Sequence, residues 1–151
     1  MYFALLVLHS LLRWLMLGSL CYAIYTAFRG VTQRLLFTGK VNAIRQWTTT
    51  IAHLQLVVGM TIYIQSPLVN MKASGVASFT EHTFFKYVHI SLMMLAIVLI
   101  TIGSARAKRA EGDQEKYKMM LTWFLMALVV ILIAIPWPFS PLAQRPWLRL
   151  F

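Results

Sequence analysis

The chain has 151 residues, of which 60% are hydrophobic and 12% are charged, and its mean hydropathy is +0.70. This composition lies outside the averages of soluble globular domains and predicts a single transmembrane domain over 1–151, with no separate soluble catalytic domain. The formal net charge of +10 does not indicate a nucleic-acid partner, because the basic residues flank apolar runs and form no stripe with interleaved aromatics.

The first two predicted helices lie in the N-terminal half of the chain. An apolar run over about 2–28 is long enough to span a bilayer with some tilt, and it lacks the basic start of a signal peptide. A second run over about 47–65 has Trp47 and Tyr63 placed as interfacial anchors, and Pro67 stops it. Both segments are therefore expected to be membrane-spanning helices.

Two further apolar runs predict the third and fourth helices. The third covers about 79–105 and begins with the capping-box pattern Ser78-x-x-Glu81. The fourth covers about 118–136 and is closed by Pro136, after which the tail 137–151 is expected to lie along the membrane surface. The predicted fold class is all-α, a four-helix transmembrane bundle.

The distribution of Lys and Arg predicts how the four helices are oriented. The loops between the first and second and between the third and fourth helices carry nine basic residues: Arg29, Arg34, Lys40, Arg45, Arg106, Lys108, Arg109, Lys116 and Lys118. The opposite side carries four, which are Lys72, Lys86, Arg145 and Arg149. By the positive-inside rule, the two loops face the cytoplasm and both termini lie on the periplasmic or outer side.

Ionisable side chains inside the predicted spans are the candidate functional residues, because a charged group in a bilayer is costly. His9 and Arg13 lie on the first helix, His53 on the second and His89 on the third. At about 1.5 Å rise per residue, His9 and His89 both lie roughly 9 to 10 Å outward of the midplane. Arg13 lies about 3 Å outward of it and His53 about 3 Å inward. The first and last of the three histidines thus share one depth.

Two imidazoles at one depth on different helices meet the requirement of a six-coordinate b-type haem, in which one histidine binds iron on each face. We therefore expect haem b, with His9 and His89 as the iron ligands and His53 as the alternative ligand. Another interpretation stays open, because an intramembrane histidine can also form a hydrogen bond with a carbonyl, Thr or Tyr of a neighbouring helix.

Arg13 indicates a polar or anionic ligand independently of the histidines. The acidic residues Glu81, Glu111, Asp113 and Glu115 lie in predicted loops or at helix ends, away from its depth. Its guanidinium is therefore expected to contact a haem propionate, a quinone oxygen, a lipid head group or an acidic residue of another subunit. Snorkelling to water and carbonyl groups is the alternative.

Sequence patterns in all four predicted helices carry a resemblance to a known family. They are His9-Ser10-Leu11-Leu12-Arg13, His53-Leu54-Gln55 followed by Gly59, Tyr87-Val88-His89 leading to Gly103, and Ile135-Pro136-Trp137-Pro138-Phe139. Over nearly its whole length the chain resembles a family of small bacterial four-helix membrane proteins commonly labelled cytochrome b-like. The resemblance implies a four-span protein of the bacterial inner (cytoplasmic) membrane, with His9, Arg13, His53 and His89 as its site residues.

These features predict an integral membrane protein of electron transfer and not a stand-alone enzyme. We expect it to pass electrons between a quinone, or a partner redox subunit of a respiratory complex, and the outer face. The alternative is a cofactor-free accessory subunit of a larger membrane complex. The expected partners are membrane lipids, and other membrane subunits or further copies of the chain. The clustered histidine boxes of di-iron hydroxylases and the His-Glu-x-x-His pattern of metalloproteases are absent from the sequence.

Overall fold

The computed structural model describes residues 1–70, 79–139, 143 and 145, and over these residues it is all-helical, apart from short turns. Its elements in chain order are α1 (Tyr2–Thr32), α2 (Gly39–Gln65), α3 (Pro67–Asn70), α4 (Phe79–Thr83), the π-helix η1 (Phe84–His89), α5 (Ile90–Arg109) and α6 (Asp113–Ala134). The predicted all-α class is confirmed for this part of the chain. Lys72, Ser78, Arg149 and most of the predicted tail 137–151 lie outside the described residues.

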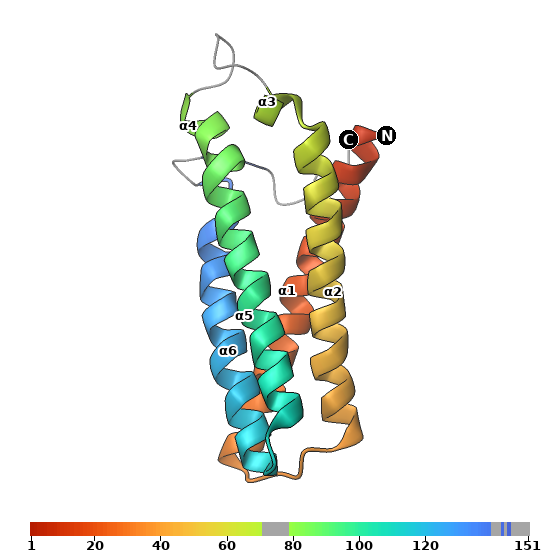
Figure 1. Cartoon of the computed structure of the whole chain (residues 1–151), viewed down its shortest axis with the longest axis vertical. Helices are drawn as coiled ribbons and strands as arrows, with labels where there is room; N and C mark the ends of the chain where they lie inside the picture. Colours follow the sequence, from red (N-terminus) through yellow and green to blue (C-terminus); the bar gives the residue numbers. More distant parts are fainter. Residues whose placement is uncertain (71–78, 140–142, 144, 146–151) are drawn as a thin grey trace.

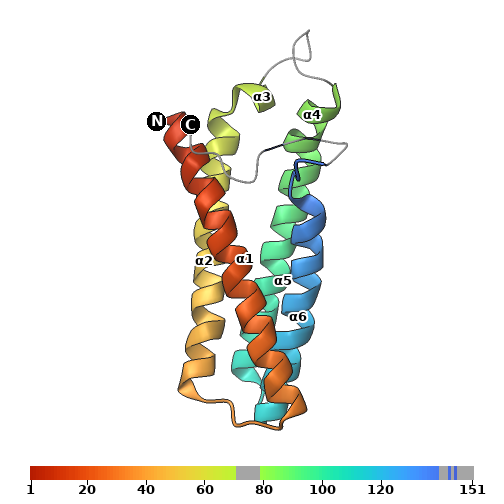
Figure 2. The same ribbon diagram turned by 180° about the vertical axis from the view of Figure 1, so that it is seen from behind.

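The described residues form four long helical segments, which pack side by side in one bundle (Figure 1). The third segment is made of α4, η1 and α5, which follow one another without a break. α1 contacts α2 and α6, and α5 also contacts α2 and α6, so the four segments enclose a common interior. Met1 lies at the end of the bundle where α2 finishes and α4 begins, which we call the N-terminal end (Figure 2). The α1–α2 and α5–α6 connections lie at the opposite end, the loop end.

Three of the helical segments are long and apolar enough to cross a membrane. They are Tyr2–Thr32, Glu81–Arg109 and Asp113–Ala134, with 31, 29 and 22 residues. A membrane-spanning helix needs about 20 predominantly apolar residues, so each of these has sufficient length. The structure therefore has the helices of a multi-pass membrane protein.

α2 has 27 residues but is more polar than the other three long segments. Several of its polar side chains are buried inside the bundle, among them Arg45, Thr48 and Gln55. Arg45 donates hydrogen bonds to the backbone carbonyl and hydroxyl oxygens of Ser104 on α5 and to the side-chain oxygen of Asn42. The polar residues of α2 therefore attach it to its neighbours, and its hydropathy alone underestimates how well it fits a bundle.

The helices extend beyond the predicted apolar runs at several ends. α2 begins at Gly39 and not at Trp47, because Thr38 caps it by accepting a hydrogen bond from the backbone N–H of Val41 at 3.5 Å. α6 runs over Asp113–Ala134 and not over 118–136. It ends early because a residue before proline avoids the helical conformation, and Ile135 before Pro136 has φ −68° and ψ 129°. α1 and α5 continue to Thr32 and Arg109, past the predicted ends at 28 and 105.

The packed core occupies the middle and the loop end of the bundle. Its fully buried side chains include Leu20, Ile100, Tyr117 and Phe124. α1 and α6 approach closely at Gly30, where an added Cβ would lie 2.3 Å from the ring of Tyr117. The side chains of α1 and α6 therefore pack tightly against each other in this part of the bundle.

Candidate functional site

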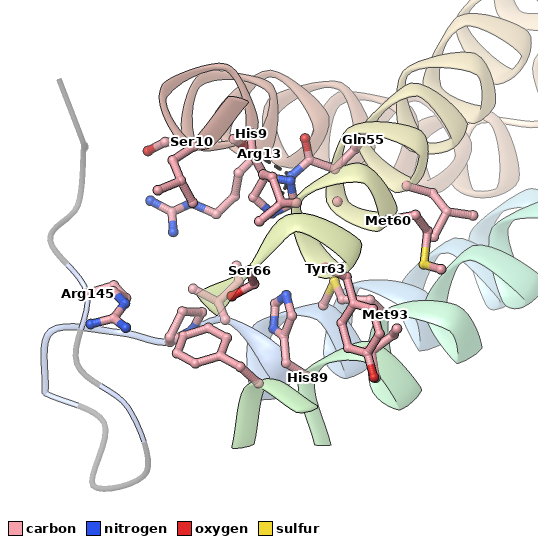
Figure 3. Close-up of a pocket in the computed structure, with 18 of the residues that line it drawn as sticks. His9, Ser10, Arg13, Gln55, Met60, Tyr63, Ser66, His89, Met93 and Arg145 are labelled. Carbon is pink, nitrogen blue, oxygen red and sulfur yellow. Dashed lines mark hydrogen bonds between the residues drawn. The ribbon is translucent and has the colours of Figure 1, made fainter. Parts of the chain in front are cut away.

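A cavity of about 200 Å³ lies inside the N-terminal end of the bundle (Figure 3). Its walls come from all four long segments and from α3, and most of the lining side chains are apolar. The polar side chains of the lining are Tyr2, His9, Ser10, Arg13, Gln55, Tyr63, Ser66, His89 and Arg145. An apolar cavity with a few convergent polar groups is typical of a ligand or cofactor site, and we call this the bundle cavity.

α1 contributes His9 and Arg13 to the bundle cavity from one face of the helix. The two residues are four positions apart, and Tyr2, Leu6 and Met16 continue the same face. This spacing places His9 and Arg13 on one helix face, and both side chains therefore reach the same cavity. The guanidinium of Arg13 also lies over the ring of Trp14, 5.5 Å from its centroid.

His89 enters the cavity from the opposite wall, at the end of the π-helix η1. Its ring contacts the rings of Phe84 and Phe85, with centroid distances of 5.9 and 5.8 Å, and these two rings also contact each other at 5.2 Å. Its Nδ1 lies 2.8 Å from the backbone oxygen of Ala134, a carbonyl in the last turn of α6 that has no partner within the helix. Because a carbonyl only accepts, Nδ1 carries the proton, and Nε2 of the neutral ring has a free lone pair.

Figure 3 shows the ring of His89 pointing across the cavity towards the wall that carries His9 and Gln55. A histidine that donates Nδ1–H to a backbone carbonyl is in the tautomer that binds a metal through Nε2. His9 and His89, which their positions in the sequence predict at one depth, both line this one cavity.

His9 is held by Gln55 from α2. The side-chain amide of Gln55 donates to the backbone oxygen of His9 at 3.2 Å and to its Nε2 at 3.3 Å. Nε2 of His9 therefore acts as an acceptor, and the proton of the neutral ring is on Nδ1. The edge of the ring rests against Gly59, where an added Cβ would lie 3.2 Å from Cε1 of His9. Gly59 thus allows the imidazole to approach the α2 backbone.

His53 is not part of the cavity. Its side chain is exposed on the outward surface of α2, and its Nε2 lies 3.0 Å from the hydroxyl oxygen of Thr101 on α5. The hydroxyl of Thr101 donates its hydrogen bond to the carbonyl of Ile97 at 2.7 Å. The Thr101 oxygen therefore accepts a hydrogen bond from Nε2–H of His53. The structure thus separates this histidine from His9 and His89.

Arg145 also lines the cavity, although its sequence position indicated only a basic residue on the outer side of the membrane. It comes from the C-terminal tail, forms an ion pair with Glu81 of α4 and lies over the ring of Phe85 at 5.0 Å. Its role depends on the path of the chain after α6, so no local sequence signal could have identified it. Gln55 did have such a signal, because it is an amide within a predicted span.

The cavity contains two histidines from facing walls, and a pair of histidines is the protein donor set that a b-type haem would require. Among the described residues, no group of three or more His, Cys, Asp or Glu side chains could hold a metal ion. A haem needs fewer protein ligands, because the porphyrin supplies four nitrogens and the protein only the axial pair. The Nε2 lone pair of His89 accepts no hydrogen bond from a described residue. The Nε2 lone pair of His9 would become available if its hydrogen bond with the Gln55 amide were broken. Comparisons with protein-family models, with curated proteins and with solved structures found no match.

Proposed function

We propose that this chain is a membrane-bound b-type haem protein of electron transfer, with His9 and His89 as the axial ligands. The observation that supports this most strongly is the tautomer of His89, whose Nδ1–H donates to Ala134 and whose Nε2 is left as an acceptor beside an apolar cavity. An imidazole acceptor that faces such a cavity can be satisfied by a donor or a metal. The resemblance to proteins labelled cytochrome b-like is consistent with the same function.

The residues of the chain have separate roles in this proposal. The apolar lining excludes water, and the carbonyl of Ala134 fixes the orientation of His89 and raises its basicity. Arg13 places a positive charge one helical turn from His9, where it would bind a propionate or a quinone oxygen. Bound haem would supply one-electron redox chemistry, with a quinone or a partner redox subunit as the exchange partner.

We further propose that α2 crosses the membrane as the fourth span, in the inner membrane of a bacterium. It packs against α1 and α5 in the bundle, and its buried polar side chains Arg45 and Thr48 have partners on these two helices (Figure 1). The basic residues of the loop end support a cytoplasmic position for that end. The cavity then lies in the outer half of the membrane, near the outer face.

The optical spectrum of the purified protein tests the haem assignment. The full chain is expressed in haem-replete cells, purified in detergent and, in parallel, reconstituted with added haem b. We expect a Soret band and a sharp α band on reduction, and a pyridine haemochrome of the b type. A protein that stays colourless after both treatments contradicts the assignment.

A cofactor-free accessory subunit is the second candidate function. It is favoured by the contact of Gln55 with His9, in which two polar side chains of the cavity already satisfy one another across α1 and α2. In that case the polar residues of the cavity would bind lipid or another subunit, and the purified chain would be colourless but would co-purify with its partner.

A further inference from the structure

The contact between Gln55 and His9 leaves one donor and one acceptor without a partner. Gln55 is only 8% exposed, and its side-chain oxygen Oε1 is buried and forms no hydrogen bond with any described residue. The same holds for Nδ1 of His9. Because Nε2 of His9 accepts from the Gln55 amide, Nδ1 carries the proton. The unpaired atoms of these two neighbouring side chains are therefore complementary, an acceptor on Gln55 and a donor on His9.

The same contact blocks the atom through which His9 would bind iron. The imidazole Nε2 has one lone pair, and the amide of Gln55 uses it at 3.3 Å. Iron requires that lone pair, so the amide and the metal compete for it. His89 has no such competitor, since its hydrogen bond is made by Nδ1. The two histidines thus differ, and only His9 needs a rearrangement.

We propose that Gln55 is a positioning residue for His9 that changes its hydrogen bond when haem binds. This inference rests on the proposed function. The hydrogen bond from the Gln55 amide to His9 Nε2 breaks, and Gln55 Oε1 accepts a hydrogen bond from the Nδ1–H of His9 after the two side chains reorient. The lone pair of Nε2 would then be available to hold iron. No proton or electron is transferred, and both unpaired atoms gain a partner.

The rearrangement has a defined consequence for the metal. An acceptor on Nδ1–H makes the imidazole a stronger donor, and a stronger donor favours ferric over ferrous iron. Loss of that acceptor raises the reduction potential. If Gln55 only held α1 against α2, its replacement would change the stability of the protein but not the reduction potential of the haem.

The reduction potential of bound haem tests this role. Gln55→Leu removes the acceptor without adding a charge. We expect it to lower the affinity of His9 for ferric iron, relative to its affinity for ferrous iron, about tenfold. This change raises the reduction potential by about 59 mV for a one-electron couple. Gln55→Glu supplies a stronger acceptor and should lower the potential. Gln55→Met is measured as well, in case the branched leucine disturbs the helix interface.

Thr50→Val is the matched control, because Thr50 lies on the exposed face of α2 and its hydroxyl donates only to Gln46 of its own helix. It should leave the potential unchanged. Potentials of the Leu and Met variants that equal that of the unaltered protein overturn the role of Gln55 while the haem assignment stands. An unaltered protein that binds no haem overturns both, and the optical spectrum records that result before any potential is measured.

Discussion

Among the residues of the bundle cavity, His89 is the one whose orientation the fold constrains most. Its imidazole packs in one cluster with two phenylalanine rings, and its Nδ1–H donates to the carbonyl of Ala134. These contacts come from two elements: Phe84 and Phe85 belong to η1, and Ala134 is in the last turn of α6. A ring held from two elements can bind a ligand without losing further rotational freedom, which favours tight binding.

Removing either proposed axial histidine should abolish the six-coordinate spectrum. His9→Ala and His89→Ala each remove one axial bond, whereas His53→Ala is expected to leave the spectrum intact because His53 lies outside the cavity. The measurement is the optical and EPR spectrum of each purified variant, with membrane insertion as the control for folding. A normal spectrum in both His9→Ala and His89→Ala would show that the axial pair is wrong.

Arg13 should affect retention of the ligand more than it affects folding. Arg13→Leu removes an intramembrane charge and should insert normally, but the loss of a charged hydrogen bond to the ligand should weaken haem retention about tenfold or more. Arg13→Lys keeps the charge without the planar fork and should lie between the two. Haem dissociation into apomyoglobin measures retention. Equal dissociation rates in all three proteins would exclude a ligand contact.

At the scale of the elements, the π-helix η1 determines how His89 meets the cavity. A π-helix bonds each residue to the fifth residue along the chain, so Phe84 and His89 fall on the same side of the helix. Their rings are in contact, and Phe84 is almost completely buried. π-helical turns are rare and occur mainly at functional sites, and this one coincides with a proposed ligand.

Close approach of α1 and α6 at Gly30 predicts a specific loss of stability. Gly30→Ala places a Cβ 2.3 Å from the ring of Tyr117, which is itself fully buried, and should cost about 1–3 kcal/mol. Gly18→Ala is the matched control on the same helix, since no atom lies within 4 Å of its added Cβ. That variant should be neutral or slightly more stable, because alanine favours helix.

Unfolding of the two glycine variants in detergent, followed by circular dichroism, measures this difference. The Gly30 variant should unfold at a lower temperature than the unaltered protein, and the Gly18 variant should not. Equal losses in both variants would indicate that overpacking against Tyr117 is not the cause.

At the scale of the whole molecule, the even number of proposed spans puts both connections of the loop end on one side of the membrane. Single cysteines at Leu36 and Gly112, in a Cys21→Ser background, should react with a membrane-impermeant thiol reagent only from the cytoplasmic side. A tag before Met1 should be accessible only from outside. Labelling of the two loops from opposite sides would show that α2 does not cross the membrane.

Much of this architecture can be predicted from the sequence. The helical class, three apolar segments long enough to cross a membrane and the scarcity of charge within them follow from composition along the chain, because transfer into a bilayer is nearly additive over residues. The choice of His9, Arg13, His53 and His89 as candidates followed from the same cost, since an ionisable group in lipid requires a reason. His53 is the one of the four that does not line the cavity. The depth estimate also assigned His9 and His89 to one level, and both line one cavity.

Which polar residues meet was decided only by the tertiary structure. Depth along a helix is set by sequence position, but the direction of a side chain depends on the rotation of each helix about its axis, which packing contacts determine. His53 and Gln55 are two residues apart on α2, and yet one is exposed and the other is buried against His9. Three other features likewise depend on contacts between distant segments or on local backbone geometry. They are the π-helix before α5, the early end of α6 at Ala134 and the ion pair of Arg145 with Glu81. The packing of the helices gives His89 a defined tautomer and places the amide of Gln55 on Nε2 of His9. Composition along the chain predicts apolar helices, but it does not predict these contacts, because they depend on how the helices pack.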